Sequence, residues 1–537
     1  MSYLSRPSTL AGGATVAPIA RQRGRHVIIL SLLAILGTAA GFRMVGTADR
    51  SLWFDEAFSW RLASFPPGEI VARSAADNNP PLYYLALKLW MSLVGESTVA
   101  IRLLSVLAGL VSCLGAYLLV REAYGGAGAL DDWTRKSHAA RARWMGACAA
   151  ALIAASSYQI RWGWEARMYT LGAALAVGSS WLLLRALRSE GPSYWRWSLY
   201  SIAALLFLYT HTYAVFSVAA QWLYAAAWLW VRGPRRSTNS AGASPVWGAA
   251  LGAGLIAAAW SPWLFVLLGQ AARVRQTFWS GTLDRWDLPH FCHQMLVSED
   301  APLTHVGSLA AAVACIVVLV QLLWRPREGD WLLFLMAGLP VVGGLLVSSA
   351  GTNILHPRYL LFAHVFLLIA LARLIGRIPA LSERTAVAGV LLTNMLFVHL
   401  AFWQRLEISN RPGVRAAARY IEQRREENAP IVVASPFFFS PVLYHLTNRT
   451  ECYLLDDGKG FPHYQGTAAL KPADFFAAGR LPSLRSTQIW VVNNRSSGVW
   501  GDHAVAVPSG WAKREHRTFL EAYDVQGQVE VIEYKAR

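Results

Sequence analysis

The sequence has few charged residues, few cysteines and no internal repeat, and each of these shortages excludes a class of protein. Of its 537 residues, 15% are charged and 55% are hydrophobic, and the mean hydropathy of +0.33 is too high for a soluble enzyme of this length. Cys113, Cys148 and Cys315 fall inside apolar runs, so the five cysteines do not form a disulfide framework. Cys292 and Cys452 lie in segments that we predict outside the membrane, and a bridge between them stays open. The absence of a repeat of solenoid length excludes a repeat protein.

The excess of positive charge is spread along the chain. The formal net charge is +17, but the basic residues stand between apolar runs and are not gathered on one domain. This is the positive-inside pattern of a multi-pass membrane protein, and it argues against a nucleic acid as a partner.

Apolar runs of membrane-spanning length recur from residue 27 to residue 403. They predict about eleven crossings, the first at His26–Val45 and the last at Thr385–Trp403. Residues 1–25 are basic and rich in Ser, Gly and Pro, which predicts a disordered cytoplasmic tail. Every loop that this topology assigns to the inside carries a basic cluster, so we expect the N-terminus inside and the C-terminus outside.

The same pattern divides the chain into parts. Residues 26–403 form a transmembrane domain with a large first external loop at 46–98, in which Leu82–Val94 reads as a partly inserted helix. Residues 404–537 read as a small external α/β domain. Its predicted strands are Ile431–Ala434, Cys452–Leu455, Ile489–Val492 and Val529–Tyr534, and its predicted helices are Pro412–Glu427 and Leu443–Thr447. This domain contains no phosphate loop, metal spacing or catalytic triad, so we expect a structural, gating or acceptor-binding role.

The stretch Ser51–Trp60 follows the first apolar run and sets Asp55 and Glu56 among Trp53, Phe54, Phe58 and Trp60. Charge is costly to bury beside a membrane, so acids kept in such a place usually have a partner, a metal or a reaction. Solvated loop acids are the alternative, but four aromatic neighbours make that environment a poor fit.

Further polar residues recur at the outer ends of the predicted helices. They are Arg161, Glu165, Arg167, Tyr169, His211, Tyr213, His356, Arg358 and Tyr359. Taken singly, each suits a structural role, because arginines extend toward head groups and tyrosines belong to the aromatic belt. Together on one face, they predict an external pocket that holds a phosphate, a polar acceptor and a general base.

Five motifs then match a known family in the expected order. They are Trp53–Ala57 (WFDEA), Asn79–Tyr84 (NPPLYY), Glu165–Tyr169 (EARMY), Tyr209–His211 (YTH) and Pro357–Leu361 (PRYLL). Over residues 27–403 the chain resembles bacterial GT-C glycosyltransferases, in the branch of the protein O-mannosyltransferases and the lipid A aminoarabinose transferase.

The resemblance implies transfer of a sugar from a polyprenyl-phosphate donor, with inversion, at the outer face of the bacterial inner membrane. The acceptor hydroxyl would belong to a glycolipid, a polysaccharide or a protein. By this likeness Asp55 is the general base and Glu56 orients Asp55 or the acceptor. No cofactor is certain. Some relatives place a divalent metal ion near the site, but many of them have a histidine where this chain has Asn79, which weakens a metal site there.

A leaving lipid phosphate needs cations, and we expect Arg358 and Arg167, with Arg161 behind them and Tyr359 beside them, to bind it. The remaining residues predicted to bind substrate are Asp77, Asn79, Tyr83, Glu165, Tyr169, His211, Tyr213 and His356. Two other functions stay open. A transporter or lipid flippase also has many spans, although its polar residues usually lie near the bilayer midplane. A membrane scaffold would not need the two acids.

Overall fold

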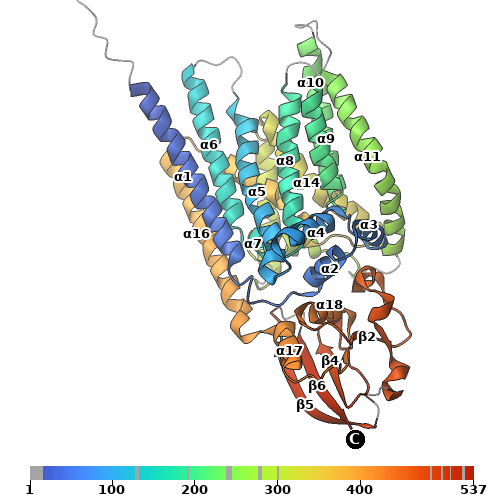
Figure 1. Ribbon diagram of the computed structural model, residues 1–537. Coiled ribbons are helices and arrows are strands. Elements are labelled where there is room, and N and C mark those ends of the chain that lie inside the picture. The colour runs from blue at the N-terminus through green and yellow to red at the C-terminus, as the bar shows by residue number, and fades with distance from the viewer. Residues whose placement is uncertain are drawn as a thin grey trace, which may run out of the picture.

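The protein is a bundle of long helices with a small α/β domain at one end (Figure 1). The computed structural model describes residues 16–126, 132–189, 193–237, 245–275, 281–298, 301–483, 486–496, 500–507, 509–522 and 527–537. This architecture confirms the predicted fold class, a helical multi-pass membrane protein followed by a small sheet-containing domain.

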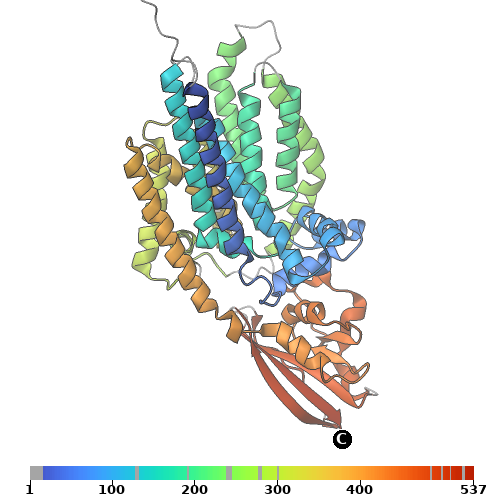
Figure 2. The same ribbon diagram turned by 60° about the vertical axis from the view of Figure 1, so that its left-hand side comes forward.

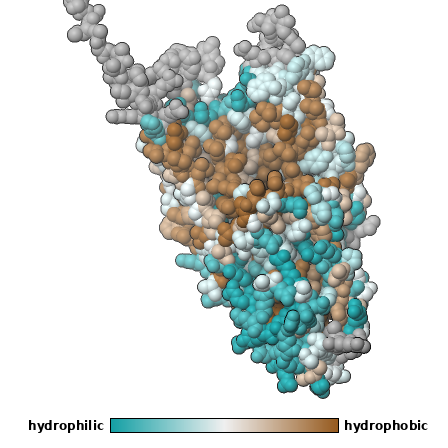
Figure 3. Space-filling view, in the orientation of Figure 1, coloured by the Kyte–Doolittle hydropathy of each residue, from teal (hydrophilic) through white to brown (hydrophobic). Residues whose placement is uncertain are grey.

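The long helices run side by side, as Figures 1 and 2 show from two directions. They are α1 (Val16–Met44), α5 (Thr98–Gly125), α6 (Asp132–Ala155), α8 (Tyr169–Leu187), α9 (Tyr194–Leu208), α10 (Ala214–Ser237), α11 (Pro245–Val274), α13 (His305–Leu323), α14 (Glu328–Ser349), α15 (Leu361–Ile375) and α16 (Leu381–Leu406). In the part of the chain that the structure describes, nine of them are long and apolar enough to cross a membrane. On the face that Figure 3 shows, their outer side chains form a hydrophobic band across the bundle, as a lipid environment requires.

The two other crossings predicted from the sequence correspond to α6 and α9. Helix α9 has 15 residues, short of the roughly 20 that span a bilayer, and the first half of α6 carries Arg141 and Arg143. Both helices pack within the bundle, α6 against α5 and α9 against α8 and α11.

The N-terminal helix is longer than the sequence predicts. Helix α1 begins at Val16 and therefore includes residues 16–25, which we expected in the disordered tail. Its one proline, Pro18, stands in the first turn, where a missing backbone N–H does no harm. Residues 1–15 of that predicted tail lie outside the described residues.

Short helices cover the end of the bundle that faces the α/β domain (Figure 1). They are α2 (Phe54–Ala63), α3 (Pro67–Ala76), α4 (Leu82–Val94), α7 (Ser157–Gly163), α12 (Asp287–Leu296) and the 3-10 turn η1 (Pro357–Leu360). Helix α3 starts with a proline in its first turn, where proline is favoured, and α4 has the predicted bounds. These helices hold the side chains that form the candidate site.

The C-terminal domain is a six-stranded sheet with helices. Its elements are α17 (Gly413–Glu422), β1 (Ile431–Val433), α18 (Pro436–His445), β2 (Cys452–Asp456), β3 (Phe475–Ala477), β4 (Gln488–Arg495), β5 (Trp511–Leu520) and β6 (Gln528–Ala536), and short 3-10 turns η2 (Ile408–Asn410), η3 (His463–Gln465), η4 (Thr467–Ala469), η5 (Pro472–Asp474) and η6 (Ala478–Ser483) connect them. The strand order is β3-β2-β1-β4-β6-β5, with β4, β6 and β5 antiparallel and the rest parallel.

Four strands coincide with predicted ones, and two were missed. Strand β3 has three residues, and β5 is largely exposed, with a sequence too polar for the alternation of a half-buried strand. The helix predicted at Leu443–Thr447 is α18, which starts earlier, at Pro436, a residue favoured in a first turn. The free Cys292 contacts Cys315 and is not bridged to Cys452.

Contacts join the C-terminal domain to the bundle at α2. Helix α18 packs against α2, and Nη2 of Arg61 lies 2.9 Å from Oδ1 of Asp474. The hydroxyl of Tyr444 donates to the backbone oxygen of Glu96 at 2.7 Å. The domain is therefore fixed to the helix that carries the two acids.

Candidate active site

Helix α2 begins shortly after the first long span and carries both adjacent acids in its first turn. Acidic residues are favoured there because the helix dipole is positive at its N-terminus. Successive residues of a helix are rotated by roughly 100°, so the two carboxylates cannot share one environment. Asp55 faces a cavity, whereas Glu56 is completely buried.

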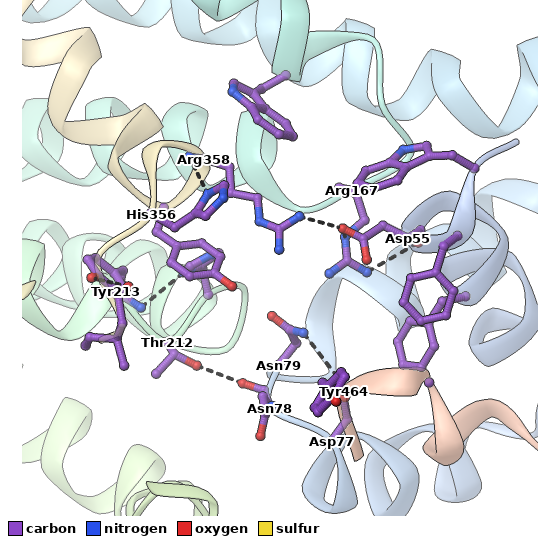
Figure 4. A pocket seen from close by; sticks show the side chains of 18 of the residues that line it. Asp55, Asp77, Asn78, Asn79, Arg167, Thr212, Tyr213, His356, Arg358 and Tyr464 are labelled. Atoms are coloured by element: carbon purple, nitrogen blue, oxygen red, sulfur yellow. Dashed lines mark hydrogen bonds and ion pairs between the residues drawn. The ribbon is translucent and has the colours of Figure 1, made fainter. Parts of the chain in front are cut away.

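Asp55 is the centre of a charge cluster with two arginines (Figure 4). Nη1 of Arg358 donates to Oδ2 of Asp55 at 2.9 Å, and Nε of Arg167 lies 4.0 Å from the same oxygen. The exposed fractions of the side chains are 13% for Asp55, 15% for Arg358 and 7% for Arg167. Two guanidinium groups and one carboxylate leave one positive charge in excess, so the cluster attracts an anion.

Local structure positions both arginines. Arg358 belongs to η1, and its backbone N–H donates to Nδ1 of His356 at 3.4 Å. Nη1 of Arg167 donates to Oγ of Ser59 at 3.2 Å and to the hydroxyl of Tyr84 at 3.4 Å. Burial alone would lower the pKa of Arg167, but the charge of Asp55 and nearby tyrosines raise it well above its ordinary value, so Arg167 is a permanent cation.

The cluster opens into a cavity of about 1100 Å³ between the bundle and the C-terminal domain. One wall is apolar and comes from α10, α11 and α14, with Val215, Phe216, Leu267, Leu268, Val274 and Val347. Another wall comes from the C-terminal domain, with Phe437, Tyr464, Gly466, Trp500 and Ala522. The cavity therefore combines charged, aromatic and hydrocarbon-like surfaces.

Most of the predicted site residues line this cavity. They are Asp55, Asp77, Asn79, Arg161, Arg167, His211, Tyr213, His356, Arg358 and Tyr359. Glu56, Tyr83, Glu165 and Tyr169 are buried and lie outside the lining. Segments separated by up to three hundred residues thus meet at one site, as their common position at the outer ends of the helices predicts.

Glu56 has a structural environment that differs from the predicted one. Its oxygens accept from Nε and Nη2 of Arg102 at 2.7 and 2.6 Å, and from the backbone N–H of Ala166 at 3.0 Å. Burial would raise the pKa of Glu56, but the charge and hydrogen bonds of Arg102 lower it below its ordinary value. Glu56 is therefore an ionised anchor beneath the cavity, because the bidentate pair occupies both of its oxygens.

Three other predicted residues also support the site from behind. The hydroxyl of Tyr83 bonds to Oγ of Ser105 at 3.1 Å, and Tyr169 packs edge-on against Trp162. Glu165 pairs with Arg161, which itself lines the cavity. Burial raises the pKa of Glu165 to about 7, with partial compensation by Arg161.

The segment between α3 and α4 forms the floor of the cavity (Figure 4). Nδ2 of Asn79 donates to Oδ2 of Asp77 at 3.1 Å, and Oγ1 of Thr212 donates to the backbone oxygen of Asn78 at 3.1 Å. Nε2 of Gln270 donates to the backbone oxygen of Asp77 at 2.7 Å. Burial raises the pKa of Asp77, so Asp77 holds a proton to higher pH than an ordinary aspartate.

The cavity histidines are neutral. Burial, together with the charges of Arg167 and Arg358, lowers the pKa of His211 to about 3. Burial and Arg358 lower the pKa of His356 well below its ordinary value. A group with so low a pKa is a weak base, so the histidines are suited to donating or accepting hydrogen bonds rather than to taking up a proton.

Reasoning from the sequence missed part of the lining. The missed polar residues are Asn78, Thr212, Gln270, Arg405, Glu407 and Arg411, and the missed aromatic residues are Phe437, Tyr464 and Trp500. The aromatic residues belong to the C-terminal domain, whose position over the cavity has no local signal in the sequence. Asn78 and Thr212 are immediate neighbours of predicted residues, so adjacency could have identified them.

The side chains present do not fit a divalent cation. Asp55 is flanked by two arginines, which oppose a metal ion on the same oxygen. Among the residues described, no group of three or more His, Cys, Asp and Glu side chains is arranged to hold a metal.

Comparisons with known proteins agree with this architecture. The model of the family "Dolichyl-phosphate-mannose-protein mannosyltransferase" matches residues 78–131, and a search of curated proteins finds no match. ArnT from Cupriavidus metallidurans, bound to undecaprenyl phosphate, has a TM-score of 0.54 at 13% identity, covering 93% of this chain and 97% of that chain. The apo state of the same protein has a TM-score of 0.55 at 12% identity, with the same coverage of both chains.

The arabinofuranosyltransferase AftD from Mycobacteria is similar over 95% of this chain and 40% of that chain, with a TM-score of 0.50 at 13% identity. Identities this low establish the fold alone. The agreement covers the helical bundle and, for ArnT, nearly the whole length of both chains. The protein is therefore a multi-pass membrane protein with the fold of the GT-C glycosyltransferases.

Proposed function

We propose that the protein transfers a sugar from a polyprenyl-phosphate donor to an acceptor hydroxyl, with Asp55 as the general base. The observation that carries this proposal is the cluster of Asp55, Arg167 and Arg358 inside a cavity that also has an apolar wall. A polyprenyl-phosphate sugar is divided in the same way, with an anionic phosphate at one end and a long hydrocarbon chain at the other. The likeness in fold to an ArnT structure that holds undecaprenyl phosphate supports the same class of donor.

The two arginines are the proposed phosphate site. Arg358 presents a guanidinium group whose fork matches two phosphate oxygens, and Arg167 adds a second permanent cation. Both side chains are largely shielded from water, which strengthens their interaction with a charge that develops as the phosphate leaves. The prenyl chain would lie along the wall formed by α10, α11 and α14.

Binding of the donor would change the state of Asp55. Without the donor, Oδ2 of Asp55 accepts from Nη1 of Arg358, so this oxygen is not available to the acceptor hydroxyl. A phosphate that takes over Arg358 releases Oδ2 of Asp55 for the acceptor. The base therefore becomes available when the donor is in place, which limits wasteful hydrolysis.

The proposed chemical step is a single inverting displacement. Asp55 takes the proton of the acceptor hydroxyl, and the hydroxyl oxygen forms a bond to the anomeric carbon. The bond between that carbon and the phosphate oxygen breaks, and the lipid phosphate keeps the electron pair while Arg358 and Arg167 stabilise its charge. The neutral His211 can donate or accept a hydrogen bond at a sugar hydroxyl without competing for the proton.

The wall from the C-terminal domain is the proposed acceptor side. The ring centroid of Trp500 lies 4.6 Å from that of Phe437 and 5.6 Å from that of Phe54, and all three residues line the cavity. Such an aromatic surface suits the ring or acyl part of an acceptor. A glycolipid, a polysaccharide and a protein all offer the hydroxyl that the reaction needs.

The distribution of arginines along the bundle supports an orientation of the protein in the membrane. The end of the bundle opposite the cavity carries Arg121, Arg185, Arg325 and Arg377 at or near the ends of helices. By the positive-inside rule, that end faces the cytoplasm, so the cavity and the C-terminal domain face outward. We place the protein in the bacterial inner membrane, with its reaction on the outer side.

A transporter is less consistent with the site. Substrate sites of transporters usually lie near the bilayer midplane on broken helices. Here Asp55 belongs to a short helix at the end of the bundle, next to the C-terminal domain (Figure 1).

The replacement Asp55→Asn tests the proposal, because asparagine keeps the shape of aspartate but cannot take up a proton. We expect transfer of a radiolabelled sugar from polyprenyl phosphate to fall by roughly 10²- to 10⁴-fold, with unchanged expression and thermal unfolding. The control Asp457→Asn makes the same chemical change on the surface of the C-terminal domain, where Asp457 pairs with Lys459, and should keep normal transfer. Undiminished transfer by Asp55→Asn would exclude Asp55 as the base.

A further inference from the structure

A second pocket lies at the end of the bundle away from the C-terminal domain, where α5, α13 and α15 end and α6 and α14 begin. Its volume is about 290 Å³. It is lined by Tyr124, His138, Arg141, Met145, Trp324, Arg325, Arg327, Arg373 and Arg377. Five of these nine residues are arginines, a density that calls for an explanation beyond general surface charge.

One buried acid organises the pocket. Asp330 is fully buried, and its Oδ1 accepts from Nε of Arg373 at 2.9 Å and from the hydroxyl of Tyr124 at 2.6 Å. Its Oδ2 accepts from Nη2 of Arg377 at 3.4 Å and from the backbone N–H of Arg327 at 2.8 Å. Asp330 thus fixes the geometry of the pocket, but its single charge can neutralise one arginine.

The remaining three arginines of the pocket are Arg141, Arg325 and Arg327. In the described part of the chain, no carboxylate forms an ion pair with the side chain of Arg141, Arg325 or Arg327. Nη1 of Arg327 lies 3.4 Å from Nδ1 of His138, and burial together with the charges of Arg327 and Arg141 lowers the pKa of that histidine. The backbone of Arg325 has φ 52°, which is uncommon for a residue with a side chain. An anion in the pocket would offset the repulsion between these like charges.

A hydrophobic stripe on α13 leads to this pocket. Its exposed side chains are Val306, Leu309, Val313, Ile316, Val317, Val320 and, just beyond the helix, Trp324. The spacing of three and four residues puts them on one face of the helix, which is directed toward lipid. Trp324 is 69% exposed and lies where aromatic residues mark the membrane boundary. Because the stripe ends at Trp324, which lines the pocket, a lipid whose hydrocarbon chain lies along α13 would have its polar end at the pocket.

We propose that this pocket binds the phosphate head group of an anionic phospholipid from the leaflet at this end of the bundle. Arg141, Arg325 and Arg327 contact the phosphate, and the acyl chains lie along α13. A volume of about 290 Å³ is at the lower limit of ligand pockets, roughly 300–1,000 Å³, so it holds a head group and leaves the chains outside. Basic pockets between helices on the cytoplasmic side commonly bind such lipids. The site is independent of the cavity at Asp55 and of the proposed reaction.

Lipid binding to the purified full-length protein tests the proposal. The protein is stripped of lipid in a non-ionic detergent and titrated with phosphatidylglycerol or phosphatidylcholine, and bound lipid is counted by native mass spectrometry. We expect one phosphatidylglycerol to bind at least tenfold more tightly than phosphatidylcholine. The double variant Arg325→Gln/Arg327→Gln should bind phosphatidylglycerol roughly 10- to 30-fold more weakly, the loss expected for two cations near an anionic lipid. Arg325→Lys/Arg327→Lys should recover most of the affinity.

The matched control is Arg121→Gln/Arg185→Gln. It removes the same charge at the same end of the bundle, from arginines that lie over Tyr117 and Trp181 outside the pocket. We expect its affinity to stay within threefold of the wild type. If thermal unfolding shows that Arg325→Gln/Arg327→Gln is not folded, Arg141→Gln replaces it. We expect Arg141→Gln to bind phosphatidylglycerol roughly threefold more weakly or worse. Equal losses in pocket and control variants, no preference for phosphatidylglycerol, or inorganic phosphate binding as tightly as the lipid would overturn the proposal.

Discussion

The ion pair between Asp55 and Arg358 predicts that one replacement will abolish catalysis and yet strengthen donor binding. If the proposed donor binds at Arg358, its phosphate must displace the carboxylate of Asp55, whose Oδ2 lies 2.9 Å from Nη1 of Arg358. Asp55→Asn removes this competitor and also removes the repulsion between carboxylate and phosphate. It should therefore tighten the binding of polyprenyl phosphate.

The structure sets the size of the effect. The side chains of Asp55 and Arg358 are 13% and 15% exposed, so solvent screens the pair weakly. A hydrogen bond between charged groups in such a setting contributes about 1.5–3 kcal/mol. Since each 1.4 kcal/mol is tenfold in affinity, this range corresponds to a dissociation constant for Asp55→Asn that is about 10- to 150-fold lower than that of the wild type.

The dissociation constants can be measured from the binding of a radiolabelled polyprenyl phosphate to the detergent-solubilised wild type and Asp55→Asn. The matched comparison is Asp77→Asn, which makes the same change at a carboxyl group of the same cavity that bonds to Asn79 instead of Arg358. The gain in Asp55→Asn should exceed the gain in Asp77→Asn. Unchanged or weaker binding in Asp55→Asn, or equal gains in both variants, would refute the idea that Asp55 occupies the phosphate site.

Three further predictions concern other parts of the molecule. Arg358→Ala should weaken donor binding by roughly 10-fold or more and change acceptor KM less, in steady-state transfer assays that vary each substrate. Arg102→Met leaves Glu56 buried without its partner and should lower the free energy of unfolding by about 3–5 kcal/mol, read as a fall in Tm. Burial raises the pKa of Glu521 to about 7 from an ordinary value of 4.5. Between these two pH values the folded state keeps a proton that the unfolded state loses, so the stability of the fold decreases as the pH rises from about 4.5 to about 7. Glu521→Gln should flatten this part of the pH profile of Tm.

Each of these predictions has a control and a contrary outcome. Arg358→Lys keeps the charge and should lose less donor affinity than Arg358→Ala; an equal loss of donor and acceptor affinity would argue against a phosphate contact. Arg102→Met combined with Glu56→Gln should recover stability, and a double variant as unstable as Arg102→Met would show that the ion pair is not the cause. A pH profile of Glu521→Gln identical to that of the wild type would assign the pH dependence to another group.

The membrane part of the fold and most of the cavity lining could be predicted from the sequence because both depend on local patterns. Apolar length and basic loops fix the course of the chain through a bilayer, and this course brings the ends of distant helices to one side. Arg358 and Asp55, separated by 303 positions, are paired in the structure for this reason. The same criteria also predicted crossings at α9 and α6, although α9 has only 15 residues and the first half of α6 carries Arg141 and Arg143.

What could not be predicted depends on side-chain direction and on packing between domains. Asp55 and Glu56 are equivalent in the sequence, and the bidentate bond from Arg102 is what directs Glu56 away from the cavity. Tyr83 and Glu165 belong to matched motifs and yet point to buried partners. Trp500 and Phe437 join the site through the docking of the C-terminal domain, which no periodicity in the membrane part encodes.

Helix α2 is held on two sides by different parts of the protein. One side presents Asp55 to the cavity, while Arg61 pairs with Asp474 and the helix packs against α18 of the C-terminal domain. A rigid ten-residue rod cannot tilt at one side alone. Under the proposed function, a ligand that shifts the C-terminal domain would therefore also shift α2 and change the position of the Asp55 carboxylate in the cavity.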